Sequence, residues 1–177
     1  GVWEKMMVYG AVLKKGERYY SYLGKVFAAI GNAQRNYNWL ISYPDCFPAT
    51  PEFGALLARE HCWLTGEELT EMIRQEDFQW VWGVLSGFAK DISWEKVMEY
   101  PVPDADSPGF WRYPLVLEHP LASLEIAAFD SSMTLLVSRE KKHVDGFRTF
   151  FPLSGDLAEE NETYQKNCVK GGTHYAD

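Results

Sequence analysis

Residues 124–138 read LEIAAFDSSMTLLVS, and this stretch decides the fold class. Two apolar runs flank Asp130-Ser131-Ser132, which is the pattern of a β-hairpin with a three-residue loop. The strands of a hairpin are antiparallel, so the sheet that contains it is not the parallel sheet of a doubly wound fold. The stretch therefore favours an α+β fold with a mixed, largely antiparallel sheet.

Apolar runs elsewhere in the chain predict further strands, over residues 7–13, 37–43, 78–88 and 115–117. In residues 37–43 every second side chain is large and apolar, which is the period of a strand. Residues 78–88 are apolar on both sides, as in a central strand that is covered on both faces. A regular strand would point four of these side chains to one face: Phe78, Trp80, Trp82 and Val84. His61 to Leu64 is interpreted only as a brief apolar link.

Helical spacing of apolar side chains predicts four helices and one short helical turn. They cover residues 17–31, a segment that begins at Pro51, residues 66–76, residues 140–151, and the turn at 93–98. The third helix has the clearest start, because Thr65-Gly66-Glu67-Glu68 matches a capping box. Gly146 weakens the last helix, since glycine is a poor helix former. These helices are expected to pack on one or both faces of the sheet.

A single domain is predicted over residues 1–153, which is enough chain to bury one hydrophobic core. Pro101 to Gly109 is rich in proline and aspartate and predicts a long surface loop. After Leu153 the chain turns polar and has few branched apolar side chains. Residues 154–177 are therefore expected to form a flexible tail.

The chain is acidic: 25 Asp and Glu oppose 17 Lys and Arg, which gives a formal net charge of -8 over 177 residues. Such a surface repels nucleic acid, and no basic cluster offsets it. The charge can steer a basic protein partner, or it can simply keep the protein in solution. No apolar stretch is long enough to span a bilayer, and no secretory signal is recognisable, so we expect a cytoplasmic protein with no membrane partner.

No motif for catalysis, cofactor binding or metal binding stands out. The chain has no glycine-rich phosphate loop and no nucleophile elbow. Its three cysteines and four histidines lack the spacing of zinc ligands or of a disulfide framework. His61-Cys62 is the one reactive-looking pair, but neighbours on an extended chain point to opposite faces. We therefore predict no catalytic residue, no metal site and no cofactor.

Glu125 lies inside an apolar strand of the hairpin, on the same side as Ala127 and Phe129. Its carboxylate either faces solvent or is buried with a perturbed pKa. Because charged side chains are seldom buried without partners, we expect the solvent-facing arrangement.

Aromatic side chains make up 15% of the chain, and several flank the proline-rich loop. Trp111 and Tyr113 follow the loop at a spacing of two, and Asp104 and Asp106 give the loop negative charge. Tryptophan and tyrosine are frequent at binding hot spots, and prolines lower the cost of ordering a loop. These four residues are the candidate binding site for a basic, partly apolar partner. The alternative is that the rings cover the sheet and stabilise it.

Three stretches resemble an uncharacterised family of small proteins from Gram-positive bacteria: Tyr37–Ser42, Leu64–Leu69 and Leu124–Ser138. Their order and approximate spacing agree over about residues 20–150. The chain departs from the family in the 101–109 loop, the first strand and the tail. The resemblance implies a small bacterial cytosolic protein. Because the family has no assigned activity, no functional residue follows from it.

Three functions are compatible with these features. The first is a non-enzymatic binding protein, for example an immunity or regulatory protein that masks a basic partner. The second is a small-molecule or peptide binder with an aromatic pocket beside the sheet. The third is an enzyme whose site is assembled from distant residues, such as Glu125 and a histidine in one cleft.

Overall fold

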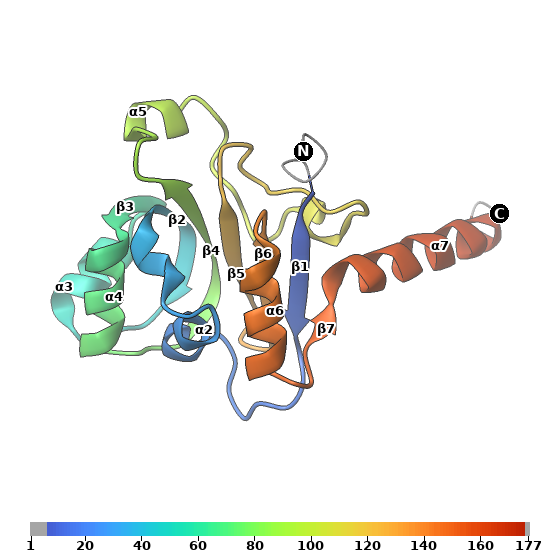
Figure 1. Cartoon of the computed structure of the whole chain (residues 1–177), viewed down its shortest axis with the longest axis horizontal. Coiled ribbons are helices and arrows are strands. Elements are labelled where there is room, and N and C mark those ends of the chain that lie inside the picture. Colours follow the sequence, from blue (N-terminus) through green and yellow to red (C-terminus); the bar gives the residue numbers. More distant parts are fainter. Residues whose placement is uncertain (1–6, 176–177) are drawn as a thin grey trace.

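A seven-stranded sheet forms the middle layer of the protein, in the order β3-β2-β4-β5-β6-β1-β7 (Figure 1). The computed structural model describes residues 7–175. Every pairing in the sheet is antiparallel, which confirms the predicted α+β class. The strands are β1 (Tyr9–Leu13), β2 (Tyr37–Cys46), β3 (His61–Thr65), β4 (Trp80–Ala89), β5 (Leu124–Phe129), β6 (Met133–Ser138) and β7 (Gly155–Asp156).

Helices cover one face of the sheet, which we call the helix face (Figure 1). Their apolar side chains pack with Trp39, Ile41 and Leu85 of the central strands into one buried cluster. Removing this apolar surface from water is the main stabilising contribution on this face. The elements are α2 (Leu23–Ala29), the 3-10 turn η1 (Ala33–Asn36), α3 (Pro51–Leu57), α4 (Gly66–Gln75) and α6 (Lys141–Phe150).

The opposite face is covered mainly by irregular chain, and we call it the loop face. Its apolar side chains pack against Leu40, Phe88 and Leu135 of the sheet in a second buried cluster. The prediction that β4 is covered on both faces is therefore confirmed. The cover consists of α5 (Trp94–Val97), η2 (Pro108–Trp111), the irregular chain on both sides of η2, and the start of α7 (Leu157–Tyr175).

This cover bears on two predictions. Residues 101–107 form the predicted irregular surface loop, with Asp104 and Asp106 exposed, but Pro108 and Gly109 belong to η2, and Ala105 is buried against the sheet. Residues 115–117 form no strand, although Leu115 and Leu117 are both buried in the loop-face cluster. The apolar loop face needs a cover, and this segment crosses it instead of joining a sheet edge.

The two best-marked local structures form where the sequence predicts them. Thr65 Oγ1 accepts a hydrogen bond from the Glu68 N–H (3.0 Å), and Glu68 Oε1 accepts one from the Thr65 N–H (2.9 Å), which completes the capping box of α4. In the β5–β6 hairpin, Phe129 pairs with Met133 across the three-residue loop. Both structures depend on residues close together in the chain, which is why the sequence identifies them.

The helix predicted over residues 17–31 is confined to Leu23–Ala29. Ser21 has a left-handed backbone (φ 64°), and its hydroxyl is hydrogen-bonded to Thr134 Oγ1 at 2.7 Å. This contact with β6 holds the chain in a non-helical form ahead of α2. Tyr19, which lies within the range predicted as helix, precedes α2 and is 58% exposed.

Residues 61–64, predicted as a link, instead form most of the edge strand β3, which pairs with β2. Cys62 and Leu64 are buried in the helix-face cluster, whereas Trp63 packs on the loop face. This is the alternation of a strand, but the run is too short to be recognised as one in the sequence.

A bulge in β4 changes which sheet face its even-numbered side chains point to. Trp80 belongs to the helix-face cluster and Trp82 to the loop-face cluster, so the prediction that both point the same way is wrong. The register with β2 shifts between Ser42 and Asp45 and again between Asp45 and Cys46, and at the second shift β4 has the extra residue, Val81, between Trp80 and Trp82. On β4 itself, Gly83 adopts a φ of 153°, which a side chain would strain. An extra residue in one strand re-aims the side chains that follow it.

The prediction that the fold ends at Leu153 and a loose tail follows is wrong for the first part of residues 154–177. The segment adds β7 to the sheet and then forms α7. Leu157 is fully buried, and the buried Asn161 Nδ2 donates hydrogen bonds to the carbonyls of Phe110 (2.9 Å) and Arg112 (3.0 Å). Beyond these contacts α7 extends away from the body (Figure 1).

Candidate binding groove at the β1 edge

An open sheet edge lies beside the first half of β1. The short strand β7 pairs with β1 only at Ala11 and Val12. Among residues 7–175, no strand lies beside Tyr9 and Gly10 on that side. Along an antiparallel strand, every second residue turns both its N–H and its C=O outward. This edge therefore carries backbone donors and acceptors that a further strand could use.

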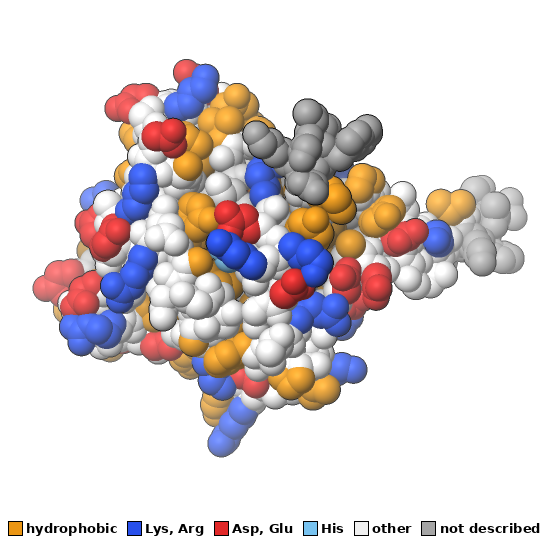
Figure 2. All heavy atoms as spheres, viewed as in Figure 1, with side chains coloured by type: hydrophobic (Ala, Val, Ile, Leu, Met, Phe, Trp, Pro, Cys, Tyr) orange, Lys and Arg blue, Asp and Glu red, His pale blue; other side chains and the backbone are white. Residues whose placement is uncertain are grey.

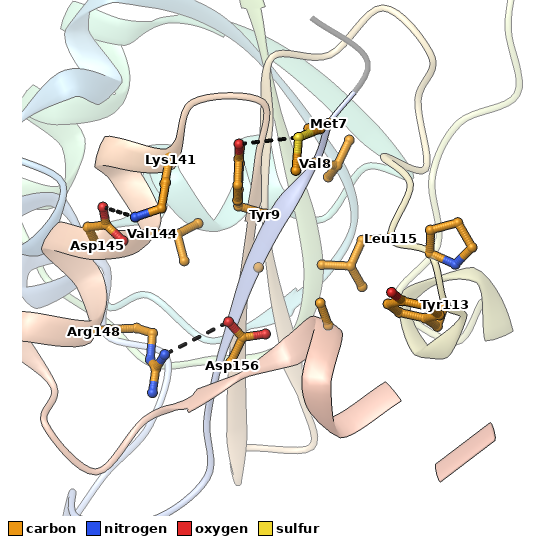
Figure 3. A pocket seen from close by; sticks show the side chains of 13 residues that line it. Met7, Val8, Tyr9, Tyr113, Leu115, Lys141, Val144, Asp145, Arg148 and Asp156 are labelled. Atoms are coloured by element: carbon orange, nitrogen blue, oxygen red, sulfur yellow. Dashed lines mark hydrogen bonds and ion pairs between the residues drawn. The ribbon is translucent and has the colours of Figure 1, made fainter. Parts of the chain in front are cut away.

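The open edge forms the floor of a groove with a volume of about 570 Å³ (Figure 3). One wall is a stripe of α6 on the helix face, formed by Lys141, Val144, Asp145 and Arg148. These positions share one side of the helix because residues three and four apart are neighbours. The other wall, on the loop face, contains Tyr113, Pro114, Leu115 and the start of α7. The volume is within the usual range of ligand sites.

Gly10 brings the loop-face wall close to β1. A Cβ at this position would lie 2.8 Å from Leu115 Cδ1 and 3.0 Å from Leu157 Cδ2. The first contact is shorter than real Cβ atoms show and the second is tighter than most, so a larger residue would displace the ends of these two leucine side chains. Gly10 therefore lets Leu115, which lines the groove, pack close to β1.

The charges of the groove are balanced within it. Lys141 Nζ lies 2.7 Å from Asp145 Oδ2, and the hydrogen bond and charge of that carboxylate raise the pKa of Lys141. Arg148 Nη1 is 3.9 Å from Asp156 Oδ2, at the β7 end of the groove. Pairs as exposed as these add little stability, so each charge is free to exchange its partner for one on a ligand. On the face drawn in Figure 2, acidic and basic side chains are likewise interspersed.

The structure separates the four candidate residues proposed from the sequence. Tyr113 lines the groove and is 39% exposed. Trp111 does not line it, because its ring packs on Phe129 with the ring centroids 5.3 Å apart. Asp104 and Asp106 are exposed elsewhere on the loop, where Asp104 Oδ1 accepts the Asp106 N–H (3.0 Å). The residues of the α6 wall had no signal in the sequence beyond their shared spacing.

The expectation that the Glu125 carboxylate faces solvent is wrong, because this side chain is completely buried. Ser86 Oγ donates to Glu125 Oε2 (2.7 Å), the Glu118 N–H donates to Oε1 (2.6 Å), and the His119 N–H donates to Oε2 (3.1 Å). Burial raises the pKa of Glu125 to about 7, although these three hydrogen bonds oppose the shift. The carboxyl group of Glu125 on β5 thus connects residues 118 and 119 of the loop-face cover to the centre of the sheet.

His119 is buried beside Glu125, but the two do not form a catalytic pair. The His119 ring occupies both of its nitrogens: Nδ1 accepts the Leu121 N–H (3.2 Å), and Nε2 lies 2.8 Å from the carbonyl oxygen of Val97. Burial lowers the pKa of His119, so the neutral ring is favoured. Both side chains have no exposed surface, so a substrate could not reach them in this conformation.

We expect the buried carboxyl group to make the protein more stable in mild acid. The folded state holds the proton of Glu125 more tightly than the unfolded chain does, so its contribution is full below about pH 4.5 and is lost as the pH rises through about 7. At about 1.4 kcal/mol per pKa unit, the loss is on the order of 3 kcal/mol.

Urea unfolding of the wild type and of Glu125→Gln at pH 5 and pH 8 measures this loss. Burial lowers the pKa of His119 and of His143, and these two shifts make the protein more stable as the pH rises. Both histidines are present in the wild type and in Glu125→Gln, so their contribution cancels when the two proteins are compared at each pH. The stability difference between the two proteins should change by about 2.5 kcal/mol between the two pH values, because a small part of the loss has already occurred at pH 5. A difference that stays constant with pH would contradict the role given to Glu125.

The other reactive side chains do not form a site. His61 stacks near Trp94 on the loop face, whereas Cys62 lies in the helix-face cluster. Burial raises the pKa of Cys62 to about 11 and that of Cys46 to about 12, which keeps both thiols protonated and poorly nucleophilic. Within residues 7–175, no three His, Cys, Asp or Glu side chains are grouped so that they could hold a metal ion.

Two further findings concern the chain as a whole. None of the helices within residues 7–175 combines the length and the apolar character needed to cross a membrane. The resemblance to a family of Gram-positive bacteria stays a prediction. Comparisons with protein-family models, with curated proteins and with solved structures found no match to this chain.

Proposed function

We propose that the protein is a non-enzymatic protein-binding domain that takes one extended segment of its partner as an additional strand beside β1. The observation that carries this proposal is the unpaired edge of β1 at the floor of a walled groove. Strand addition to an exposed sheet edge is a recurring mode of peptide recognition, in which backbone hydrogen bonds supply affinity.

The length of the open edge sets the length of the bound segment. Four residues of the chain, Met7 to Gly10, line the groove ahead of the last partner of β7. At about 3.3 Å per residue, they span roughly 13 Å, which suits a segment of about three to five residues. The segment would continue the line of β7 along β1.

The two walls determine which side chains the segment carries. Side chains of a strand point alternately to the two faces of its sheet. One set would meet the charged stripe of α6, and the other would meet Tyr113 and Leu115. The segment should therefore alternate polar or charged residues with apolar ones. The net charge of -8 favours a basic partner through long-range attraction.

A single segment suits this edge better than the sheet of a second copy does. The helix α7 leaves the body at the same edge, directly after β7 (Figure 1), and Ala158 of α7 lines the groove. A flat sheet that approached β1 would meet α7, whereas one strand fits between the walls.

Selection from a library of random linear peptides displayed on phage tests the proposal. We expect enriched sequences with period-two alternation. Tyr113→Asp should weaken their binding about tenfold or more, because it places a charge in the apolar wall. Phe47→Asp is the matched control, since Phe47 is 83% exposed and lies outside the groove.

Backbone methylation separates strand addition from recognition of side chains alone. The peptide nitrogens of a strand form two alternating sets, and only one set donates to the neighbouring strand. Methylating that set removes the donors that a new strand needs and should abolish binding, whereas methylating the other set should not. The proposal would be overturned by selected peptides that still bind when either set of nitrogens is methylated, or by peptides that bind Tyr113→Asp as tightly as the wild type.

A further inference from the structure

A second hollow, with a volume of about 690 Å³, lies on the helix face between the end of α2 and the first turns of α6. Five of its lining residues are alanine or glycine, so little side-chain volume fills it. Gly146 is one of them: a Cβ there would lie 2.6 Å from the carbonyl oxygen of Ala29. The glycine that weakens α6 by propensity thus lets the two helices approach closely.

The lining of this hollow is basic in an acidic protein. It includes Arg35, Lys142 and His143, and none of the described residues that line it is Asp or Glu. The whole chain, by contrast, has 25 acidic and 17 basic side chains. The amides of Asn32 and Asn36 add hydrogen-bonding groups to the same lining.

Arg35 and Lys142 are the two permanent cations of the lining, and they differ in their ion pairing. In the part of the chain that the structure describes, Arg35 forms no ion pair; Glu71 on the adjacent α4 is bonded to Arg74 (2.5 Å), which lowers the pKa of that carboxyl group, and the charge of Arg35 only adds to this shift. Lys142 Nζ lies 3.2 Å from Glu140 Oε2 at the rim. Both cations are exposed, so a dissolved anion can reach them.

His143 is buried at the edge of the hollow and does not add a charge. Its Nδ1 is hydrogen-bonded to Ser138 Oγ at 2.8 Å, and its Nε2 lies 3.4 Å from Glu140 Oε2. Burial lowers the pKa of His143, although Glu140 opposes the shift, so the ring is mainly neutral near pH 7. The attraction for an anion therefore comes from Arg35 and Lys142.

The start of α6 adds a second, independent attraction. The N-cap residue Glu140 makes no capping hydrogen bond with its side chain, and the first turn contains no acidic residue. The N–H groups of Lys141 and Lys142 have no partner within the helix, whereas the His143 N–H is bonded to the Glu140 carbonyl oxygen (3.2 Å), and the positive end of the helix dipole lies there. Cations at this end of a helix are unfavourable, and Lys141 and Lys142 are offset only by their exposed pairs with Asp145 and Glu140, which add little stability.

We propose that this hollow binds the phosphate group of a small ligand between Arg35 and Lys142. A guanidinium presents a planar pair of donors that matches two phosphate oxygens, and the ammonium group contributes a second positive charge. Two cations opposed by one rim carboxylate favour a dianion over a monovalent carboxylate. This site is separate from the β1 groove and does not depend on the proposed function.

Titration of the isotopically labelled full chain with inorganic phosphate and with pyrophosphate, at constant ionic strength, tests the site by NMR. We expect saturable shifts of backbone amides confined to residues 28–36 and 140–146. Arg35→Ala and Lys142→Ala should each weaken binding about fivefold or more. Glu140→Gln should strengthen it, because the carboxylate that competes for Lys142 is removed.

Lys25→Ala is the matched control, because Lys25 is an exposed lysine of α2 that is paired with Glu17 and lies outside the hollow. It should leave phosphate affinity unchanged. Shifts that do not saturate, or that persist with equal affinity in both Arg35→Ala and Lys142→Ala, would overturn the proposal. All the substituted side chains are exposed, so the wild-type fold is expected in each variant.

Discussion

Replacement of Trp80 by alanine is expected to lower the free energy of unfolding by about 3–5 kcal/mol, and replacement of Trp82 by clearly less. Trp80 is fully buried in the helix-face cluster, with its ring 5.5 Å from that of Phe78. Removing it leaves a cavity that rigid neighbours fill only in part. Trp82 is half-buried, so it has less apolar surface to lose.

Urea unfolding of both variants measures the difference between the two tryptophans. Trp80→Phe is a useful third variant, because the buried indole N–H of Trp80 has no hydrogen-bond partner among residues 7–175. Phenylalanine removes that unpaired donor while keeping an aromatic ring, so it should cost much less than alanine. Equal losses for Trp80→Ala and Trp82→Ala would show that the bulge in β4 does not separate the two rings.

Ending the chain after Leu153 is expected to destabilise the fold by about 4 kcal/mol or more, whereas ending it after Lys166 should cost less than about 1 kcal/mol. The shorter chain loses β7, the fully buried Leu157 and both hydrogen bonds of Asn161. It also uncovers Leu115 and Phe110 in the loop-face cluster. The longer chain keeps all of these contacts, and the first residues that it loses, Asn167, Cys168 and Val169, are exposed.

Thermal and urea unfolding of the two truncated chains tests where the domain ends. Asn161→Ala isolates the hydrogen bonds to residues 110 and 112 and should cost about 1–2 kcal/mol. A chain that ends at Leu153 and unfolds like the wild type would restore the domain boundary first expected from the sequence. A large loss on ending at Lys166 would show that the part of α7 beyond that residue contributes to stability.

The parts of the fold that could be predicted are those whose signals are local. The capping box at Thr65 and the hairpin around Asp130 fix their own geometry through neighbours in the chain. The helix expected from residue 17 failed because Ser21 is held by Thr134, a contact that no local pattern contains. The faces of Trp80 and Trp82 were misassigned for the same reason, since the bulge belongs to the pairing of two strands.

The candidate site was predictable only in part. Tyr113 could be proposed because it is an aromatic residue beside a stiff loop. The groove itself depends on the sheet order, which places β1 at the edge beside a two-residue strand. The burial of Glu125 likewise depends on N–H groups that the loop-face cover brings to it. Neither arrangement has a signature in residues that are close together in the sequence.

The place of β1 in the sheet has a consequence during synthesis of the chain. β1 lies between β6 and β7, and it is separated from both by most of the sequence. At roughly 5–20 residues per second, β1 leaves the ribosome on the order of ten seconds before β6 exists to pair with it. The apolar run of β1 stays unpaired while β2, β3 and β4 can already associate, so β1 is made before the other strands of this sheet but is among the last to join it. Contacts this distant in sequence slow folding and prolong exposure to aggregation.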